Sequence, residues 1–150
     1  MTIEKRRLRM WLRMLRTTKS VETRLREFLR DKHDTTLPRF DVLAALYRAE
    51  DGLKMSALSK QLLVSNGNVT GIVDRLVSDG LVKRIMVEND RRSTVVCLSS
   101  KGRKNFLRMA DQHAMLIDGL FSNIDDTDLN VMADIFARLK QKEDAHEQIG

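Results

Sequence analysis

Apolar residues recur every three to four positions along most of the chain, which is the period of an amphipathic helix. The longest such segment covers residues 3 to 31. Its stripe consists of apolar side chains at helical spacing: Leu8, Trp11, Leu12, Leu15, Val21, Leu25, Phe28 and Leu29. A helix of this length spans about 42 Å, which is too long for the rest of a 150-residue chain to cover. The segment therefore predicts a partner helix, and a second copy of the chain is the simplest partner.

The segment from 36 to 63 predicts two shorter helices. Pro38 favours the first turn of a helix, and the apolar stripe that follows it ends before Asp51-Gly52. Leu53-Lys54-Met55 is expected to form a short strand beside the strands that follow later. Ser56 then stands where a hydroxyl caps the free N–H groups of a first helical turn. The apolar positions of this next helix are Leu58, Leu62 and Leu63.

Another short helix is predicted after a break at Val64-Ser65. Ser65 is the natural N-cap, and Gly80 supplies the left-handed residue that ends the helix. One side of the helix is apolar and consists of Val69, Ile72, Val73 and Leu76. The other side carries short polar groups and one cation: Asn66, Asn68, Thr70, Gly71, Asp74 and Arg75. Such a surface suits contact with base edges in the major groove of DNA.

Two strands joined by a polar turn follow this helix. Residues 81–85 and 94–98 are rich in β-branched and apolar side chains, as strands are, and residues 88–90 have the composition of a turn. Arg91 and Arg92 lie beside that turn, and a narrow basic ribbon of this kind fits a minor groove. Helix, turn, helix and ribbon together make a winged helix-turn-helix. We therefore predict a mostly α-helical fold with a small β-wing, of the α+β class.

Two more helices are predicted after Gly102. The first has its apolar face at Phe106, Met109, Ala110, His113, Ile117, Leu120 and Phe121. We interpret His113 on this face as a packed side chain and not as a metal ligand. Residues 125–128 place carboxylates at the start of the second helix, where the helix dipole favours them. The buried face of that last helix is expected to consist of Leu129, Met132, Ile135, Phe136 and Leu139.

With these elements the chain resembles the MarR family of bacterial transcriptional regulators. The resemblance rests on the helix pair described above and on Asp90-Arg91-Arg92-Ser93 in the wing. It also rests on Leu98-Ser99-Ser100-Lys101-Gly102, which leads from the wing into the next helix. The flanking helices and the total length fit as well, so the resemblance covers nearly the whole chain.

The resemblance implies a homodimer that binds a near-palindromic operator in double-stranded DNA, most simply as a repressor. It implies one domain over residues 1–150, in which 36–102 contact DNA while 1–35 and 103–150 dimerise. The predicted DNA-binding residues come from the polar helix face and from the wing. They are Ser65, Asn66, Gly67, Asn68, Thr70, Gly71, Arg75, Lys83, Arg84, Asp90, Arg91 and Arg92.

The resemblance also implies release from DNA by a small aromatic acid, or a related thioester, that binds between the dimer helices and the DNA-contacting unit. The candidate residues for this effector combine cations with aromatic rings. They are Trp11, Arg16, His33, Arg39, Phe40 and Tyr47. A simpler interpretation stays open, in which these aromatic rings belong to the core and the cations to the solvated surface.

The charge of the chain supports a polyanionic partner. The formal net charge is +6, so a dimer carries about +12, which suits nucleic acid. Residues 1 to 30 hold ten Lys or Arg and three Glu, whereas residues 121 to 150 hold three basic and seven acidic residues. This asymmetry fits either two solvated helix faces that attract one another or a direct nucleic-acid role.

The sequence predicts neither an enzyme nor a metal or cofactor site. The single cysteine, Cys97, and the three histidines share no ligand spacing. No apolar run approaches the roughly 18 residues of a membrane helix, and no secretory signal is present. Because a lone cysteine favours a reducing compartment, we expect a cytoplasmic protein.

Two alternatives to a ligand-released repressor stay open. The first is a winged helix that contacts another protein and has no specific DNA site. The apolar triplet Ile85-Met86-Val87 in the wing points to it, because exposed apolar groups mark contact sites. The second is a repressor switched by the thiol of Cys97. Against it stands the apolar strand around Cys97, where a cysteine usually serves as a small packing residue.

Overall fold

The computed structural model describes residues 1–63, 67–87 and 90–149, without the side chains of residues 87 and 90–93. The chain divides into two compact units, Met1–Ala114 and Met115–Gly150. The expected single domain over the whole length stays a prediction. None of the helices in the described part is long and apolar enough to cross a bilayer.

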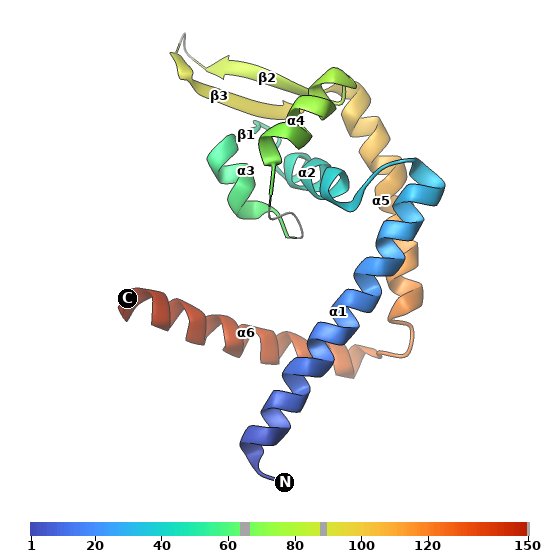
Figure 1. Cartoon of the computed structure of the whole chain (residues 1–150), viewed down its shortest axis with the longest axis vertical. Coiled ribbons are helices and arrows are strands. Elements are labelled where there is room, and N and C mark those ends of the chain that lie inside the picture. The colour runs from blue at the N-terminus through green and yellow to red at the C-terminus, as the bar shows by residue number, and fades with distance from the viewer. Residues whose placement is uncertain (64–66, 88–89, 150) are drawn as a thin grey trace. The chain divides into compact units, whose positions relative to one another are not determined.

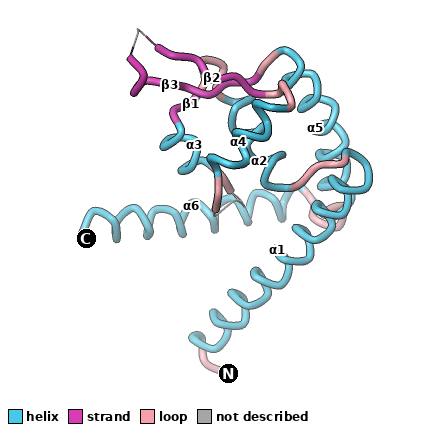
Figure 2. The backbone as a smooth tube through the Cα atoms, turned by 45° about the horizontal axis from the view of Figure 1, so that its top comes forward, coloured by secondary structure: helices cyan, strands magenta, loops and turns pink. Residues whose placement is uncertain are grey.

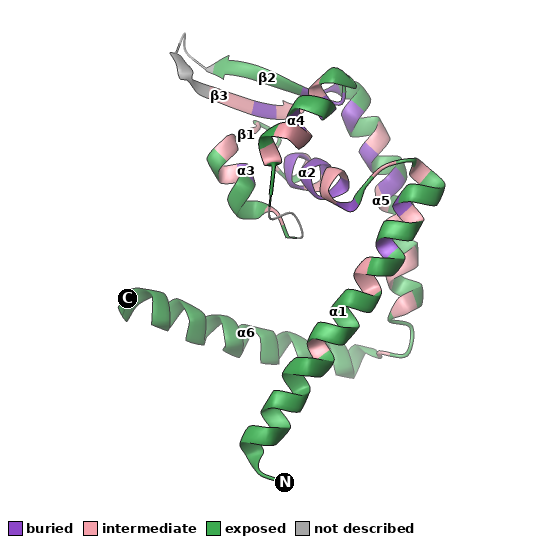
Figure 3. Cartoon of the chain, in the orientation of Figure 1, coloured by how far each residue is buried: buried purple, intermediate pink, exposed green. Residues whose placement is uncertain are grey.

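The long first helix is confirmed. Helix α1 spans Ile3–His33 and ends at Asp34, which adopts the left-handed conformation with φ of 47° (Figure 1). Its buried residues are Leu25 and Leu29, near its C-terminal end. The N-terminal half is almost entirely exposed, as the burial colours in Figure 3 show.

Helix α2 forms the centre of the core. It spans Leu37–Arg48, with Pro38 in its first turn as the sequence predicts, and Thr36 is its N-cap. Its apolar side chains are buried on nearly every side, which marks a helix surrounded by other elements. Its fully buried members are Val42, Leu43, Ala45 and Leu46.

The segment after α2 corrects two expectations. Strand β1 is Leu53–Lys54, and α3 begins directly after it as Met55–Gln61. Ser56 is therefore inside the helix, and no side chain caps its start, because the strand runs straight into the first turn. Leu58 is fully buried, but Leu63 is 81% exposed because α3 has already ended.

Helix α4 and the two wing strands follow as predicted in type. Helix α4 spans Val69–Ser78, β2 spans Val82–Val87 and β3 spans Asp90–Leu98. The strands form an antiparallel sheet in the order β1-β3-β2, so the short β1 pairs with the wing as expected (Figure 2). The pairing of β2 with β3 shifts register between Met86 and Val87.

The last two helices form as expected in type, but the first begins two residues before Gly102 and the burial differs from the expected one. Helix α5 spans Ser100–Leu120 and α6 spans Asp126–Ile149. No residue of α6 is buried. Its apolar face is 40% to 54% exposed at Leu129, Met132, Ile135, Phe136 and Leu139. The expected burial of this face is thus wrong for the single chain, whose own core ends before α6.

The core of the first unit joins α2 to α3, α4 and the wing strand β3. Leu29 of α1, Leu58 of α3, Val73 and Leu76 of α4 and Val96 of β3 are all fully buried. Helices and one small three-stranded sheet share this core, and this confirms the predicted α+β fold of helices with a β-wing. The elements that carry the candidate site are therefore fixed on one common core.

Candidate nucleic-acid interface

The recognition helix α4 begins at Val69, four residues after the predicted cap. Asn68 is the N-cap, and its Oδ1 accepts a hydrogen bond of 3.0 Å from the Gly71 N–H. A side chain at Gly71 would meet Asn68, because an added Cβ would lie 2.4 Å from the Asn68 amide. Gly71 therefore serves the cap, and its assignment to DNA stays a prediction. The predicted cap, Ser65, lies outside the described residues, as does Asn66.

The exposed face of α4 retains the predicted polar residues that are described. Thr70, Asp74 and Arg75 are exposed, whereas Val73 and Leu76 on the opposite face are buried. Gly67 and Asn68 are exposed in the turn that precedes the helix and are not part of its surface. A helix with one side anchored and one side polar presents its polar side at a fixed angle to a partner.

An ion pair links this helix to the wing. The Arg84 guanidinium of β2 donates to the Asp74 carboxylate of α4. The sequence assigned Arg84 to DNA, and that assignment stays a prediction; within the chain, its ion pair joins β2 to α4. Lys83, the other predicted cation of β2, is exposed and lies opposite Cys97 of β3.

The C-terminal end of α4 is fixed by several contacts that the sequence analysis missed. Gly80 has φ of 74° and ends the helix as predicted. The Ser99 hydroxyl donates to the Gly80 carbonyl at 2.6 Å, and the Lys101 ammonium donates to the Asp79 carbonyl at 2.9 Å. Arg39 of α2 donates to the Asp79 carboxylate at 2.5 Å. The Arg39 guanidinium lowers the pKa of Asp79 through this hydrogen bond and through its charge.

The turn between α3 and α4 has its own anchor. Asp41 of α2 is 6% exposed, and its carboxylate accepts a hydrogen bond of 2.8 Å from the Leu63 N–H. A carboxylate takes this burial only when polar groups satisfy it. The signal was present in the sequence, because Asp41 is the one acidic residue in the apolar run from Phe40 to Tyr47.

The wing is described only in part. The backbone of β3 begins at Asp90, which pairs with Val87. The side chains of Asp90, Arg91 and Arg92 lie outside the described residues, so their assignment to DNA stays a prediction. Ile85 and Met86 of β2 are 46% and 58% exposed. Cys97 of β3 is half-buried.

Some candidate effector residues meet in a second place. We define the aromatic cluster as Phe40 and Tyr47 of α2 with Phe106 and His113 of α5. The Phe40 ring stacks on His113 at 4.7 Å and lies 5.5 Å from Phe106, which is 5.0 Å from Tyr47. Arg103 lies 5.0 Å above the Tyr47 ring. Burial lowers the pKa of His113, as expected for a packed histidine.

The other candidate effector residues are placed elsewhere. Arg39 is engaged by Asp79, and His33 contacts Gln112 at 2.9 Å and the Phe28 ring. Trp11 is 50% exposed. It precedes His33 by 22 residues in one helix, a separation of about 33 Å. One chain therefore does not bring Trp11, or the nearby exposed Arg16, to the aromatic cluster.

Comparison with known proteins agrees with this geometry. The model of the MarR family matches residues 33–93. The HTH-type transcriptional regulator YfiV of Bacillus subtilis is 40% identical over 75 residues, which are 50% of this chain and 46% of that protein. The chain spans about half the length of the curated relatives that it matches.

Solved structures extend the likeness to nearly the whole chain. A MarR family transcriptional regulator from Silicibacter pomeroyi is 29% identical, with a TM-score of 0.77 over 93% of this chain and 96% of that chain. A mutant MarR from E. coli complexed with operator DNA is 23% identical and shares the fold, with a TM-score of 0.75 over 93% and 99% of the two chains.

The relatives and solved structures in these comparisons are transcriptional regulators, in agreement with the prediction that the chain is not an enzyme. The matched segment contains α2, α3, α4 and most of the wing, which are the elements that build the interface. Residues 33–93 thus match the MarR family, and the chain shares the winged helix-turn-helix fold of solved MarR family transcriptional regulators.

Proposed function

We propose that this chain is a DNA-binding transcriptional regulator whose α4 enters a major groove while the β2–β3 wing contacts the neighbouring minor groove. The observation that carries the proposal is the exposed polar face of α4, with Thr70, Asp74 and Arg75, on a buried apolar stripe. A helix fits the major groove, where each base pair presents a distinct pattern of donors and acceptors. The operator DNA bound by the E. coli MarR supports the same class of partner.

Each cation of the interface has a separate proposed role. Arg75 points from the exposed face of α4 and contacts a base edge, because arginine pairs with two acceptors of guanine. Lys83 contacts phosphate, and Arg91 and Arg92 contact the minor groove and its backbone. Arg84 acts indirectly in this proposal, since its ion pair with Asp74 joins the wing to the recognition helix.

The regulator acts as a homodimer on a near-palindromic operator. Two recognition helices contact half-sites about one helical turn apart, roughly 34 Å. Support comes from apolar side chains that single chains leave exposed, because such patches mark interaction sites. In α1 they are Leu8, Trp11, Leu12 and Leu15, and in α6 they are Leu129, Met132, Ile135, Phe136 and Leu139.

A small aromatic acid is the proposed effector, and the aromatic cluster is its proposed site. Phe40 is buried and stacked on His113, and Arg103 lies over the Tyr47 ring, so an entering aromatic ring has to displace part of this packing. Its carboxylate would compete with Asp79 for Arg39 and so remove one of the contacts that hold the C-terminal end of α4, which would shift the spacing of the two recognition helices. A coupling of about 1–3 kcal/mol is usual for such effects. Occupancy of a promoter by the dimer makes repression the simplest output. The cytoplasm is the proposed compartment, because the proposed partner is DNA.

Selection of binding sites from random duplexes, followed by fluorescence anisotropy, tests this function. The wild-type chain should enrich a near-palindromic sequence, and its affinity should fall steeply with salt. Arg75→Ala should lose about 1–3 kcal/mol of preference for the selected sequence, and Arg92→Ala should weaken binding to all duplexes. Arg108→Ala, an exposed cation of α5, is the control and should bind as the wild type does. Benzoate is the probe for release of the selected duplex.

One outcome would overturn the DNA proposal. If the affinity is the same for every duplex and depends only weakly on salt, α4 does not bind DNA in a sequence-specific way. The exposed Ile85 and Met86 of β2 would then favour the other candidate function, a winged helix that binds a protein through its wing.

A further inference from the structure

The N-terminal half of α1 carries a row of arginines whose purpose the proposed function does not explain. No Asp or Glu occurs between Lys5 and Val21, although this stretch holds seven Lys or Arg. Arg6, Arg9, Arg13 and Arg16 are spaced by three, four and three residues, which places them on one face of the helix. We call these four residues the basic ridge. All four are exposed.

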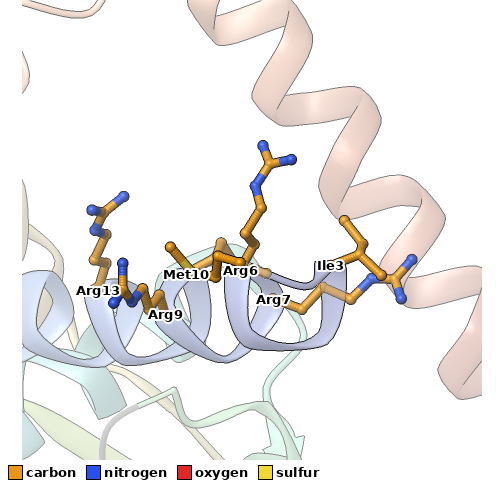
Figure 4. A pocket seen from close by; sticks show the side chains of 7 residues that line it. Ile3, Arg6, Arg7, Arg9, Met10 and Arg13 are labelled. Atoms are coloured by element: carbon orange, nitrogen blue, oxygen red, sulfur yellow. The ribbon is translucent and has the colours of Figure 1, made fainter.

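The ridge is a surface of concentrated positive charge without internal compensation. Among the described residues, none of the ion pairs includes a ridge arginine. Figure 4 shows Arg6, Arg9 and Arg13 extending from the same side of α1, where they line one surface depression with Met1, Ile3, Arg7 and Met10. Like charges three and four residues apart destabilise a helix. Repulsion between these arginines therefore destabilises the helix in the free chain, and a bound polyanion would remove that repulsion.

The ridge lies opposite the apolar stripe of the same helix. Leu8, Trp11 and Leu15 lie between the ridge residues in sequence and, at 100° per residue, project from the other side of α1. Leu12 lies at the border of the stripe, about 40° from Arg16. A second copy packed on Leu8, Trp11 and Leu15 would leave Arg6, Arg9 and Arg13 open to solvent, so these three arginines are separate from the proposed dimer contact.

The spacing of the ridge matches a nucleic-acid backbone. Arg6 and Arg16 are ten residues apart, which is about 15 Å along the helix. One strand of a duplex carries about four phosphates over that length. Guanidinium groups bind phosphate oxygens through two parallel hydrogen bonds, which makes arginine the preferred cation for this task.

The basic ridge lies too far from α4 to contact the DNA duplex that is proposed to bind there. In Figures 1 and 2 the N-terminal half of α1 extends away from β2 and β3 within the first unit. Arg6 precedes the buried Leu25 by 19 residues, or about 28 Å of helix. We infer that the basic ridge binds the phosphate backbone of a second DNA segment, so that one regulator dimer can bridge two duplexes. This inference rests on the proposed function only for the first duplex.

A two-duplex capture experiment tests the bridge. Full-length protein is loaded on an immobilised duplex, and a labelled duplex of unrelated sequence is added in solution at about 50 mM salt. The wild-type chain should capture the labelled duplex. Arg6→Gln/Arg9→Gln/Arg13→Gln should reduce capture about tenfold or more and lower its salt slope by about 2.7, or 0.9 for each phosphate that is no longer neutralised. Loading on the first duplex should stay within a factor of about three, because the variant leaves α4 and the wing intact.

A matched variant controls for net charge. Arg24→Gln/Arg26→Gln/Lys32→Gln removes three exposed cations from the same helix but outside the ridge, and it should capture as the wild type does. If both variants lose capture of the labelled duplex equally, net charge and not the position of the ridge explains the binding, and the inference is overturned. A change in the sedimentation coefficient of the ridge variant would assign these arginines to contact between copies and overturn it as well.

The remaining outcomes separate the inference from the proposed function. A wild-type chain that holds the first duplex but captures no second one contradicts the bridge alone. If neither duplex binds, both proposals fall. Ridge-dependent binding to phosphatidylglycerol vesicles without second-duplex capture would assign the ridge to a lipid surface and overturn the inference.

Discussion

At the scale of single residues, Gly102 joins the recognition helix to the wing and to α5. An added Cβ at Gly102 would lie 1.9 Å from the Leu81 carbonyl oxygen. That oxygen accepts a hydrogen bond of 3.0 Å from the Ser99 N–H, and the Ser99 hydroxyl accepts one of 2.9 Å from the Gly102 N–H. The close approach of two backbones leaves no room for any side chain, so this position requires glycine.

Gly102→Ala should therefore lower the free energy of unfolding by about 1–3 kcal/mol, because the backbone at Leu81 must move to admit the methyl group. Gly119→Ala is the matched control, since it changes a glycine of the same helix where no atom lies within 4 Å of the added Cβ. It should raise stability by up to about 1 kcal/mol through helix propensity. Urea unfolding of both variants measures the two signs, and a stabilised Gly102→Ala would contradict the close approach.

Single residues also show where the sequence was ambiguous. Ser65 and Asn68 both have the chemistry of an N-cap, and only the structure shows that Asn68 caps α4. Arg84 and Asp74 are ten residues apart and belong to different elements, so periodicity does not detect their ion pair. The bond between Asp41 and Leu63 had a signal in its apolar surroundings, but its partner depends on the packing of α2 against the turn.

At the scale of elements, the packing of α2 against α5 depends on the aromatic cluster. His113 stacks on Phe40, with 26° between the rings, and burial lowers its pKa from the ordinary 6.5. The folded chain therefore holds this imidazole neutral at a pH where the unfolded chain begins to bind a proton. The interaction contributes fully above about pH 6.5, and its contribution is lost as the pH falls below that value.

His113→Phe should make stability less dependent on pH. A phenyl ring can still pack on Phe40, but it takes up no proton in the unfolded chain. Between pH 7.5 and pH 5.5 the wild-type melting temperature should fall by more than that of the variant. Thermal unfolding at the two pH values measures the difference. Parallel losses in both proteins would show that the proton uptake occurs elsewhere.

Element type followed from periodicity whether or not the apolar face is buried within the chain. The helices α1 and α4, the left-handed Gly80 and the wing strands were predictable because local sequence fixes them. Burial was less predictable, because an apolar stripe indicates that a surface packs against it but does not identify that surface as the same chain or as another copy. In α6 that something is not the chain's own core, so the stripe at Phe136 was predicted as buried and is exposed.

At the scale of the whole molecule, the exposed stripes and the charge give the chain two kinds of unsatisfied surface. Leu8 and Trp11 of α1 and Phe136 of α6 are about half exposed, at 57%, 50% and 49%. Apolar surface of this extent favours association, whereas the formal charge of +6 per chain opposes it. A dimer is favoured only if the apolar contribution exceeds the repulsion, and bound polyanion reduces that repulsion.

Phe136→Glu should separate the copies. Removing one buried Phe costs about 1.5–3 kcal/mol, and a twofold dimer repeats the loss in each copy, so the dimer dissociation constant should rise at least about hundredfold. Ala137→Glu is the control, because it adds the same charge to the next residue, which is exposed and lies off the apolar face; it should associate as the wild type does. Sedimentation velocity over a range of concentrations gives both constants. A wild-type chain that sediments as one subunit at every concentration, or a control that dissociates as readily as Phe136→Glu, would remove α6 from the interface.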